Sequence, residues 1–220
     1  MGFDLGFLAG ALPDLLNGVI TTLEVSVLGI VLGLVIGIIG AAVITLKVPA
    51  LRWIITAYVE IFRNTPLLGQ IYFLYFGLPS LGIVYSEFIT GVIALALWCG
   101  AFATDNFSGG FNAVPKQLQE AGTALGMTRL QVYRHIVIPV GFRISFPSFG
   151  NTAISVIKCS SYLAGIGLME LTKTAMGYVS TYFKTNEMFS SLAVLYLGIV
   201  CIFTFLFTYI ERRMNHKKAS

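Results

Sequence analysis

Long apolar runs constrain this sequence more than any other feature. A helix needs about 20 mainly apolar residues to cross a bilayer. Five segments meet that requirement: residues 18–45, 53–78, 88–108, 132–157 and 188–210. Only 11% of the 220 residues are charged, against about 25% in soluble domains. The sequence therefore predicts an all-α integral membrane protein with five transmembrane helices in a single domain, residues 1–220.

The positions of Lys and Arg predict how the chain is oriented, because cytoplasmic loops carry an excess of both. These residues follow the first, third and fifth segments: Lys47, Arg52, Lys116, Arg129, Arg134, Arg212, Arg213, Lys217 and Lys218. The N-terminal tail and the 79–87 loop have none. We therefore expect the N-terminus outside, the C-terminus in the cytoplasm and a cytoplasmic loop at about 109–131. The net charge of +4 is spread over membrane-flanking loops, which argues against a nucleic acid partner.

Four glycines of the first segment, Gly29, Gly33, Gly37 and Gly40, fall on one helical face. Small residues at every fourth position let a second backbone approach closely. We expect another helix to pack there. The alternative is that glycine is simply frequent in membrane helices.

The cytoplasmic loop contains a short predicted helix with very small side chains. Pro115 is suited to open it, and Gly126 to end it in the left-handed conformation. Thr128 and Gln131 then form a capping box that starts the next helix. Small residues and the lone carboxylate of Glu120 are typical of a helix that a groove on another protein holds. The alternative is a plain surface connector.

The same loop resembles a family motif. Membrane subunits of ABC importers carry E-A-A, three residues, G, nine residues and I-x-L-P. This chain has Glu120-Ala121-Gly122, then Gly126, then Ile136-Val137-Ile138-Pro139, and differs only at Gly122 and Ile138. The stretches GVITTLEVSVLGIVLGLVIG, YVEIFRNTPLLGQIYFLYFGLP and FRISFPSFGNTAISVIKCSSYLAGIGLMEL are similar to the polar amino acid branch, of the histidine, glutamine and glutamate–aspartate type. The resemblance extends from residue 17 to about 212.

The resemblance implies a permease subunit of the bacterial inner membrane whose coupling helix docks on a cytoplasmic ABC ATPase dimer. The residues expected to make that contact are Glu120, Ala121, Gly122, Leu125 and Gly126. It also implies a second permease subunit, identical or paralogous, and an extracytoplasmic amino acid-binding protein. The chain has no G-x-x-x-x-G-K-[ST] phosphate loop. ATP and Mg are therefore expected to be used by the partner ATPase, with no cofactor bound by this chain.

A polar stripe on the fourth segment is the predicted substrate-binding surface. Asn151, Thr152, Ser155 and Lys158 recur at spacings of three and four and share one helical face. Polar groups in membrane helices usually face a bundle interior or a water-filled path. The alternatives are hydrogen bonds between helices, and for Lys158 an ammonium that reaches the interface. Basic substrates would be expected to need an acid beside Asn151, where this chain has Thr152, so we favour neutral-polar or acidic amino acids.

The predicted gate or subunit contact is a second polar group. It consists of Glu60, Arg63 and Asn64 on the second segment and Asp105 on the third. Mutual neutralisation of Glu60 and Arg63 is the alternative. The family often has an arginine where this chain has Ser108. A serine cannot form the ion pairs of an arginine, so we do not assign the role of that arginine to Ser108. His135 and His216 are far apart in the sequence. A metal site or an intramembrane enzyme is therefore not expected, and a simple channel would have no use for a docking helix.

Overall fold

The structure is a computed structural model that describes residues 3–216, with the side chains of residues 215 and 216 left out. Lys217 and Lys218 of the orientation argument lie outside the described residues. All regular secondary structure in residues 3–216 is helical, which confirms the all-α prediction. The α-helices are α1 (Leu5–Thr45), α2 (Pro49–Asn64), α3 (Leu67–Tyr72), α4 (Glu87–Asn112), α5 (Lys116–Ala124), α6 (Arg129–Val132), α7 (Ile138–Cys159), α8 (Leu171–Tyr182) and α9 (Thr185–His216).

Three helices, α1, α4 and α9, are each long and apolar enough to cross a membrane. A fourth span results if the bent unit Arg129–Ile166 plus Leu171–Tyr182 counts as one crossing. The predicted second crossing, 53–78, is interrupted between α2 and α3 at Thr65, which is extended (φ −115°, ψ 146°). The cause is Pro66, because proline disfavours helical backbone in the preceding residue. A π-helical turn, Phe73–Gly77, and a 3-10 turn, Leu78–Leu81, follow α3.

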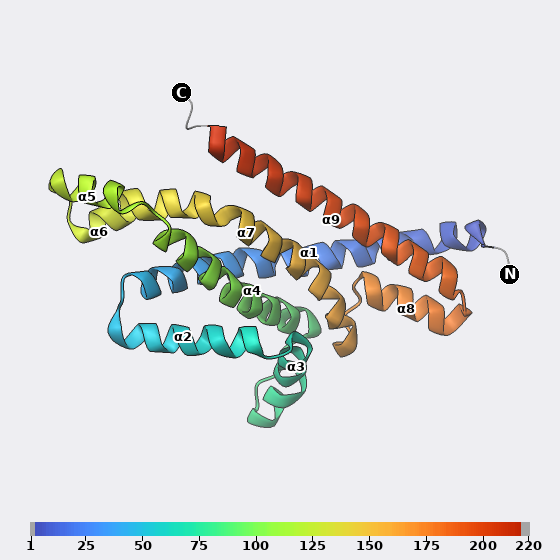
Figure 1. Ribbon diagram of the computed structural model, residues 1–220. Coiled ribbons are helices and arrows are strands. Elements are labelled where there is room, and N and C mark those ends of the chain that lie inside the picture. The colour runs from blue at the N-terminus through green and yellow to red at the C-terminus, as the bar shows by residue number, and fades with distance from the viewer. Residues whose placement is uncertain (1–2, 217–220) are drawn as a thin grey trace.

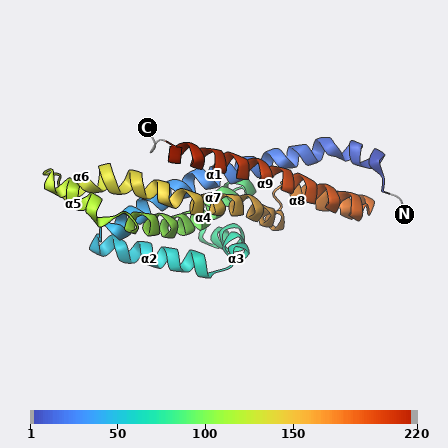
Figure 2. The same ribbon diagram turned by 45° about the horizontal axis from the view of Figure 1, so that its top comes forward.

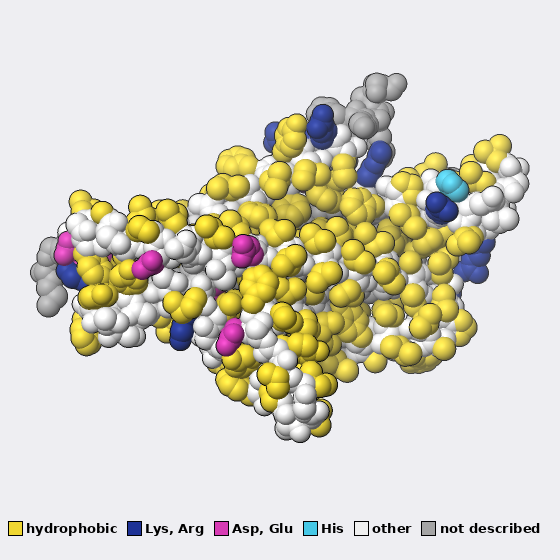
Figure 3. All heavy atoms as spheres, turned by 180° about the vertical axis from the view of Figure 1, so that it is seen from behind, with side chains coloured by type: hydrophobic (Ala, Val, Ile, Leu, Met, Phe, Trp, Pro, Cys, Tyr) yellow, Lys and Arg dark blue, Asp and Glu magenta, His cyan; other side chains and the backbone are white. Residues whose placement is uncertain are grey.

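The long helices run back and forth along one elongated molecule (Figures 1 and 2). The turn from α1 to α2 and the α5–α6 hairpin lie at one end, and the start of α1 lies with α8 at the other. Helix α9 runs from the α8 end back toward the α5–α6 half, where the described chain ends. Figure 3 shows a mainly hydrophobic face between these ends, with Lys and Arg gathered at one end and at the end of α9. This distribution fits a bundle that lies in a bilayer.

The glycine face of α1 is packed directly on α4, which confirms the predicted close approach. A Cβ built on Gly33 would lie 2.6 Å from the Cys99 Cβ. One built on Gly37 would lie 2.3 Å from the Ala103 Cβ and 3.0 Å from the Ala103 carbonyl carbon. Side chains at these positions would hold the two helices apart, so the glycines determine the separation of α1 and α4.

Two features of the end that holds α8 and the start of α1 differ from the sequence prediction. Helix α1 starts at Leu5 rather than at residue 18, because the Asp4 side chain accepts the Phe7 N–H and caps the helix. At 41 residues it is about 60 Å long, longer than a bilayer core. The stretch between the fourth and fifth predicted segments contains a helix, α8, whose N-cap is Glu170.

Glu170 is fully buried and connects three helices. Its carboxylate accepts hydrogen bonds from the Thr172 and Lys173 N–H groups of α8 at 2.9 and 2.7 Å. It also accepts one from the Tyr196 hydroxyl of α9 at 3.0 Å and a long one, 3.5 Å, from Thr22 of α1. Glu170 therefore fixes the start of α8 against α1 and α9.

Candidate functional site

The loop predicted to couple to a partner forms a compact hairpin of α5 and α6. Pro115 occupies the N-cap of α5, and the helix ends at Ala124 with Leu125 as its C-cap. Gly126 follows with φ +81°, a conformation that costs glycine little. The predicted helix bounds and the left-handed glycine are therefore confirmed.

The return of the chain into the membrane begins with the predicted capping box. The Gln131 N–H donates to the Thr128 hydroxyl at 3.3 Å, and the Thr128 N–H donates to the Gln131 side chain at 2.8 Å. After α6, a π-helical turn at Tyr133–Val137 leads into α7. The hairpin is thereby joined rigidly to a long membrane helix.

The five predicted coupling residues divide into two groups. Gly122 is buried, and a Cβ there would lie 2.7 Å from the Ile136 Cδ1. Its small size thus serves the packing of α5 on the following π-helical turn. Glu120, Ala121, Leu125 and Gly126 are exposed, and the Leu125 side chain has 83% of its surface accessible. An exposed leucine on a short helix outside the apolar face is suited to contact another protein.

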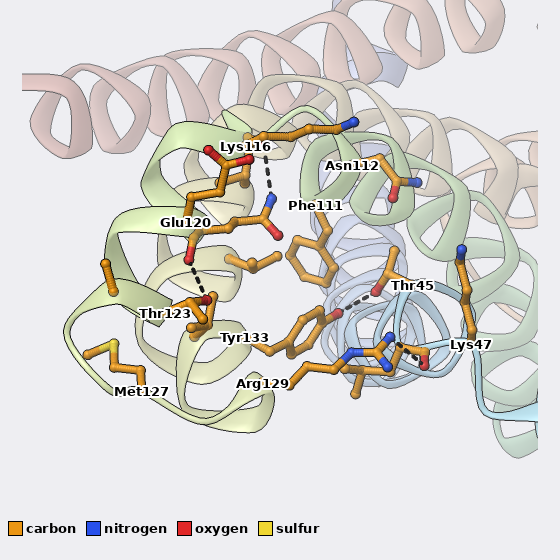
Figure 4. A pocket seen from close by; sticks show the side chains of 16 residues that line it. Thr45, Lys47, Phe111, Asn112, Lys116, Glu120, Thr123, Met127, Arg129 and Tyr133 are labelled. Atoms are coloured by element: carbon orange, nitrogen blue, oxygen red, sulfur yellow. Dashed lines mark hydrogen bonds between the residues drawn. The ribbon is translucent and has the colours of Figure 1, made fainter.

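A cavity of about 780 Å³ lies between this hairpin and the ends of α1 and α4 (Figure 4). The Lys47, Lys116 and Arg129 side chains line it together with Glu120. Arg129 donates to the Leu46 carbonyl at 3.5 Å, a long contact. The Tyr133 and Thr45 hydroxyls are hydrogen-bonded across the cavity floor and join α1 to the start of α7.

The predicted substrate stripe on α7 is only partly accessible. Asn151 and Lys158 are exposed and Ser155 is half-buried. Thr152 is buried and accepts a hydrogen bond from the Asn106 amide of α4 at 2.9 Å. Thr152 therefore forms a hydrogen bond between helices, which is the alternative to a substrate contact. The Ser155 hydroxyl donates to the Asn151 carbonyl at 2.9 Å.

Asn151 borders a small groove of about 70 Å³ between α7 and α9. Glu211 lines the same groove, with Thr204 and Thr208. Sequence reasoning missed Glu211, since its place beside Asn151 depends on how α9 packs. The groove has room for about two waters, so this chain alone does not enclose an amino acid there.

The four residues of the predicted gate lie together where α2 ends against α4. The Arg63 guanidinium forms an ion pair with the Asp105 carboxylate at 2.8 Å and lies 5.3 Å from the Phe102 ring centroid. Glu60 instead accepts a hydrogen bond from the Asn64 amide at 2.8 Å. Pairing of Glu60 with Arg63 is therefore wrong, because the rotation of α2 turns Arg63 toward α4.

Ser108, which stands where the family often has arginine, is buried within α4, and its hydroxyl has no hydrogen-bond partner in the described part of the chain. The neighbouring acid, Asp105, is paired with Arg63 of α2.

The end that holds α8 and the start of α1 carries a second charged cluster. The Lys184 ammonium contacts the Asp4 carboxylate at 2.9 Å, and the Asp4 N–H donates to Glu187 at 3.1 Å. The hydrogen bond from Lys184 lowers the pKa of Asp4, and the same bond raises the pKa of Lys184. This cluster joins the start of α1 to the turn between α8 and α9.

Metal-binding residues do not gather anywhere in the described chain: no three His, Cys, Asp or Glu residues there are placed to hold a metal ion. The three cysteines are free. The chemically distinctive places are therefore the hairpin, the α7 face and the α2–α4 ion pair.

Comparison with known proteins identifies this arrangement. Residues 29–216 match the family described as binding-protein-dependent transport system inner membrane component. The chain is 32% identical to the probable amino-acid ABC transporter permease protein PatM of Vibrio harveyi, over 98% of both proteins. It is also 32% identical to the glutamine transport system permease protein GlnP of Escherichia coli K12, over 98% of this chain and 99% of GlnP.

A solved structure has the same fold. The crystal structure of an amino acid ABC transporter with histidines superposes with a TM-score of 0.89 at 29% identity, over 97% of this chain and 100% of the other. Family, sequence relatives and fold agree. The chain belongs to the inner-membrane permease components of amino-acid ABC importers.

Proposed function

We propose that this chain forms half of the translocation pathway of an ATP-driven importer for a polar amino acid. A second permease subunit supplies the other half, a cytoplasmic ABC ATPase dimer supplies ATP and Mg chemistry, and an extracytoplasmic binding protein delivers the substrate. The N-terminus lies outside and the C-terminus in the cytoplasm. The observation that carries this proposal is the hairpin, with its exposed Leu125 at the end where the Lys and Arg residues gather.

The hairpin transmits movement because it is stiff and directly continuous with α7. The capping box and the buried Gly122 hold α5 against α6 and the π-helical turn, and the Thr45–Tyr133 contact joins that turn to α1. A partner that moves the exposed face of α5 therefore moves the membrane helices with it. Glu120, Ala121, Leu125 and Gly126 form the docking face in this proposal, and Gly122 supports it from within.

The test of docking is Leu125→Asp, with Val48→Asp as the matched control. Val48 is exposed at the same end and occupies the N-cap of α2 without a side-chain cap bond. Aspartate is favoured at that position, so the control adds the same charge without harm to the fold. We expect Leu125→Asp to lose ATPase in co-purification and Val48→Asp to retain it. Equal retention by both variants would refute docking at this face.

We further propose that the substrate passes the accessible part of the stripe, Asn151, Ser155 and Lys158. Amide, hydroxyl and ammonium groups suit the carboxylate and the polar side chain of a neutral or acidic amino acid. Glu211 beside Asn151 would favour a cationic substrate instead. Competition for uptake among glutamine, glutamate and arginine distinguishes a neutral or acidic substrate from a cationic one. A clear preference for arginine would refute the neutral or acidic assignment.

The path itself is tested by reaction with a small water-soluble thiol reagent. We expect Asn151→Cys and Ser155→Cys to react, and substrate to slow the reaction. Ala153→Cys is the control, because Ala153 is completely buried. Reaction of Ala153→Cys at the rate of Asn151→Cys, or no protection by substrate at either stripe position, would place the path on another face.

A further inference from the structure

A second groove, separate from the stripe, lies between the start of α7 and the end of α9. Its volume is about 790 Å³. The walls are formed by Ile138, Phe142, Tyr209 and Ile210, and Arg143 and Arg213 are its charged members. Arg213 belongs to the last described turns of α9, so the groove lies at the end of that helix.

Each helix contributes one continuous face. On α7, Ile138 and Phe142 are four residues apart, as are Pro139 and Arg143. On α9, Tyr209 and Arg213 are four apart, as are Ile210 and Met214. Residues four apart on a helix lie on the same side. The groove thus has apolar sides along its length and one arginine from each helix.

Neither arginine has a partner within the described residues. No ion pair or hydrogen bond involves the Arg143 or Arg213 guanidinium in that part of the chain. No Asp or Glu lines the groove either. Cations within membrane helices are expensive unless they pair with a counter-charge or reach the interface. Two unpaired arginines beside an apolar channel therefore indicate an anion that also carries apolar surface.

We propose that this groove binds an anionic phospholipid, with its phosphate between Arg143 and Arg213 and an acyl chain along Ile138, Phe142 and Ile210. Arginine suits phosphate because its planar donors match the phosphate oxygens in pairs. Basic pockets between membrane helices at the cytoplasmic side bind acidic lipid head groups by the same chemistry.

Other ligands match either the arginines or the apolar walls of the groove, but not both. A soluble anion would pair with the arginines and leave the apolar walls in contact with water. A zwitterionic lipid would fill the walls, but its own positive head group would repel the two guanidiniums. A second protein chain would need carboxylates at the depth of Arg143, about 7.5 Å along α7 from Ile138. The anionic lipid satisfies both parts at once.

The test uses the full-length chain in its purified transporter complex. Native mass spectrometry measures retention of dioleoyl phosphatidylglycerol against dioleoyl phosphatidylcholine, which share acyl chains and differ in head-group charge. Each arginine is expected to give about fivefold preference, hence about 25-fold together. Arg143→Gln with Arg213→Gln should abolish the preference. Arg52→Gln, an exposed arginine of α2 away from the groove, should keep it.

A second variant separates the apolar part from the charge. Ile210→Trp narrows the groove without altering the arginines and should reduce retention of whole phosphatidylglycerol. Three results would overturn the proposal: equal retention of the two lipids by the unaltered protein, an unchanged preference in the double variant, or glycerol phosphate binding as tightly as the whole lipid.

Discussion

Gly37→Ala should destabilise the protein by pushing α1 away from α4. The new Cβ would lie 2.3 Å from the Ala103 Cβ and 3.2 Å from the Ala103 Cα. Carbon atoms pack at about 3.5 Å or more, so the helices must separate locally by about 1.2 Å. The Ala103 atoms belong to the backbone or to a rigid Cβ and cannot rotate away. Overpacking of this kind costs about 1–3 kcal/mol.

Alanine also has a higher helix propensity than glycine, by about 1 kcal/mol, which offsets part of the strain. The expected net loss is therefore about 0–2 kcal/mol in the free energy of unfolding. The control is Gly10→Ala on the same helix, since nothing lies within 4 Å of the point that its new Cβ would occupy. That variant should be neutral or slightly more stable.

The assay is reversible unfolding of the purified full-length chain in mixed micelles, with helicity followed as denaturing detergent is added. Gly37→Ala should unfold at a lower detergent fraction than the unaltered protein, and Gly10→Ala should not. If the two variants unfolded together, the close approach of α1 and α4 would not be what the glycines provide, and the packing argument would fail.

Three further predictions concern charged residues. Glu170→Ala should lower the free energy of unfolding by about 2 kcal/mol or more, because the α8 cap and the buried hydrogen bond from Tyr196 are lost. Glu170→Gln should recover part of that free energy. The Asp4–Lys184 contact should hold between the ordinary pKa values of the two groups. It should weaken as pH falls through the lowered pKa of Asp4 or rises through the raised pKa of Lys184. Unchanged hydrogen exchange in the first turn of α1 from pH 7 to pH 3, after correction for intrinsic rates, would contradict this. Arg63 and Asp105 are partly exposed, so a double-mutant cycle should give a coupling of about 0.2–1 kcal/mol, and no coupling would show that the pair does not hold α2 to α4.

The parts of the fold that the sequence predicts are those governed by local chemistry. Pro115 and Gly126 predict helix α5, and Thr128 and Gln131 predict the start of α6, because capping depends on residues within one turn. The glycine spacing on α1 alone predicts the close approach of another helix. It does not predict that the partner is α4, because the spacing describes only one of the two surfaces.

The rest depends on tertiary contacts that local patterns do not encode. The spacing of three suggests that Arg63 pairs with Glu60, and the rotation of α2 pairs it with Asp105 instead. Helix α8 is missed by local patterns because its cap, Glu170, is stabilised by Tyr196 and Thr22 from distant segments. The helical face of Thr152 suggests a place in the pathway, although a neighbour on α4, Asn106, occupies its hydroxyl.

Transport by the reconstituted complex tests the central claim most directly. The complex would be purified through a tag on this chain, and uptake of labelled glutamine into proteoliposomes measured with its binding protein outside and ATP inside. We predict that uptake requires ATP and the binding protein. Leu125→Asp should reduce this uptake, and Val48→Asp should not. Uptake that proceeds without ATP or without a co-purified ATPase, or a complex that transports no amino acid, would contradict the assignment.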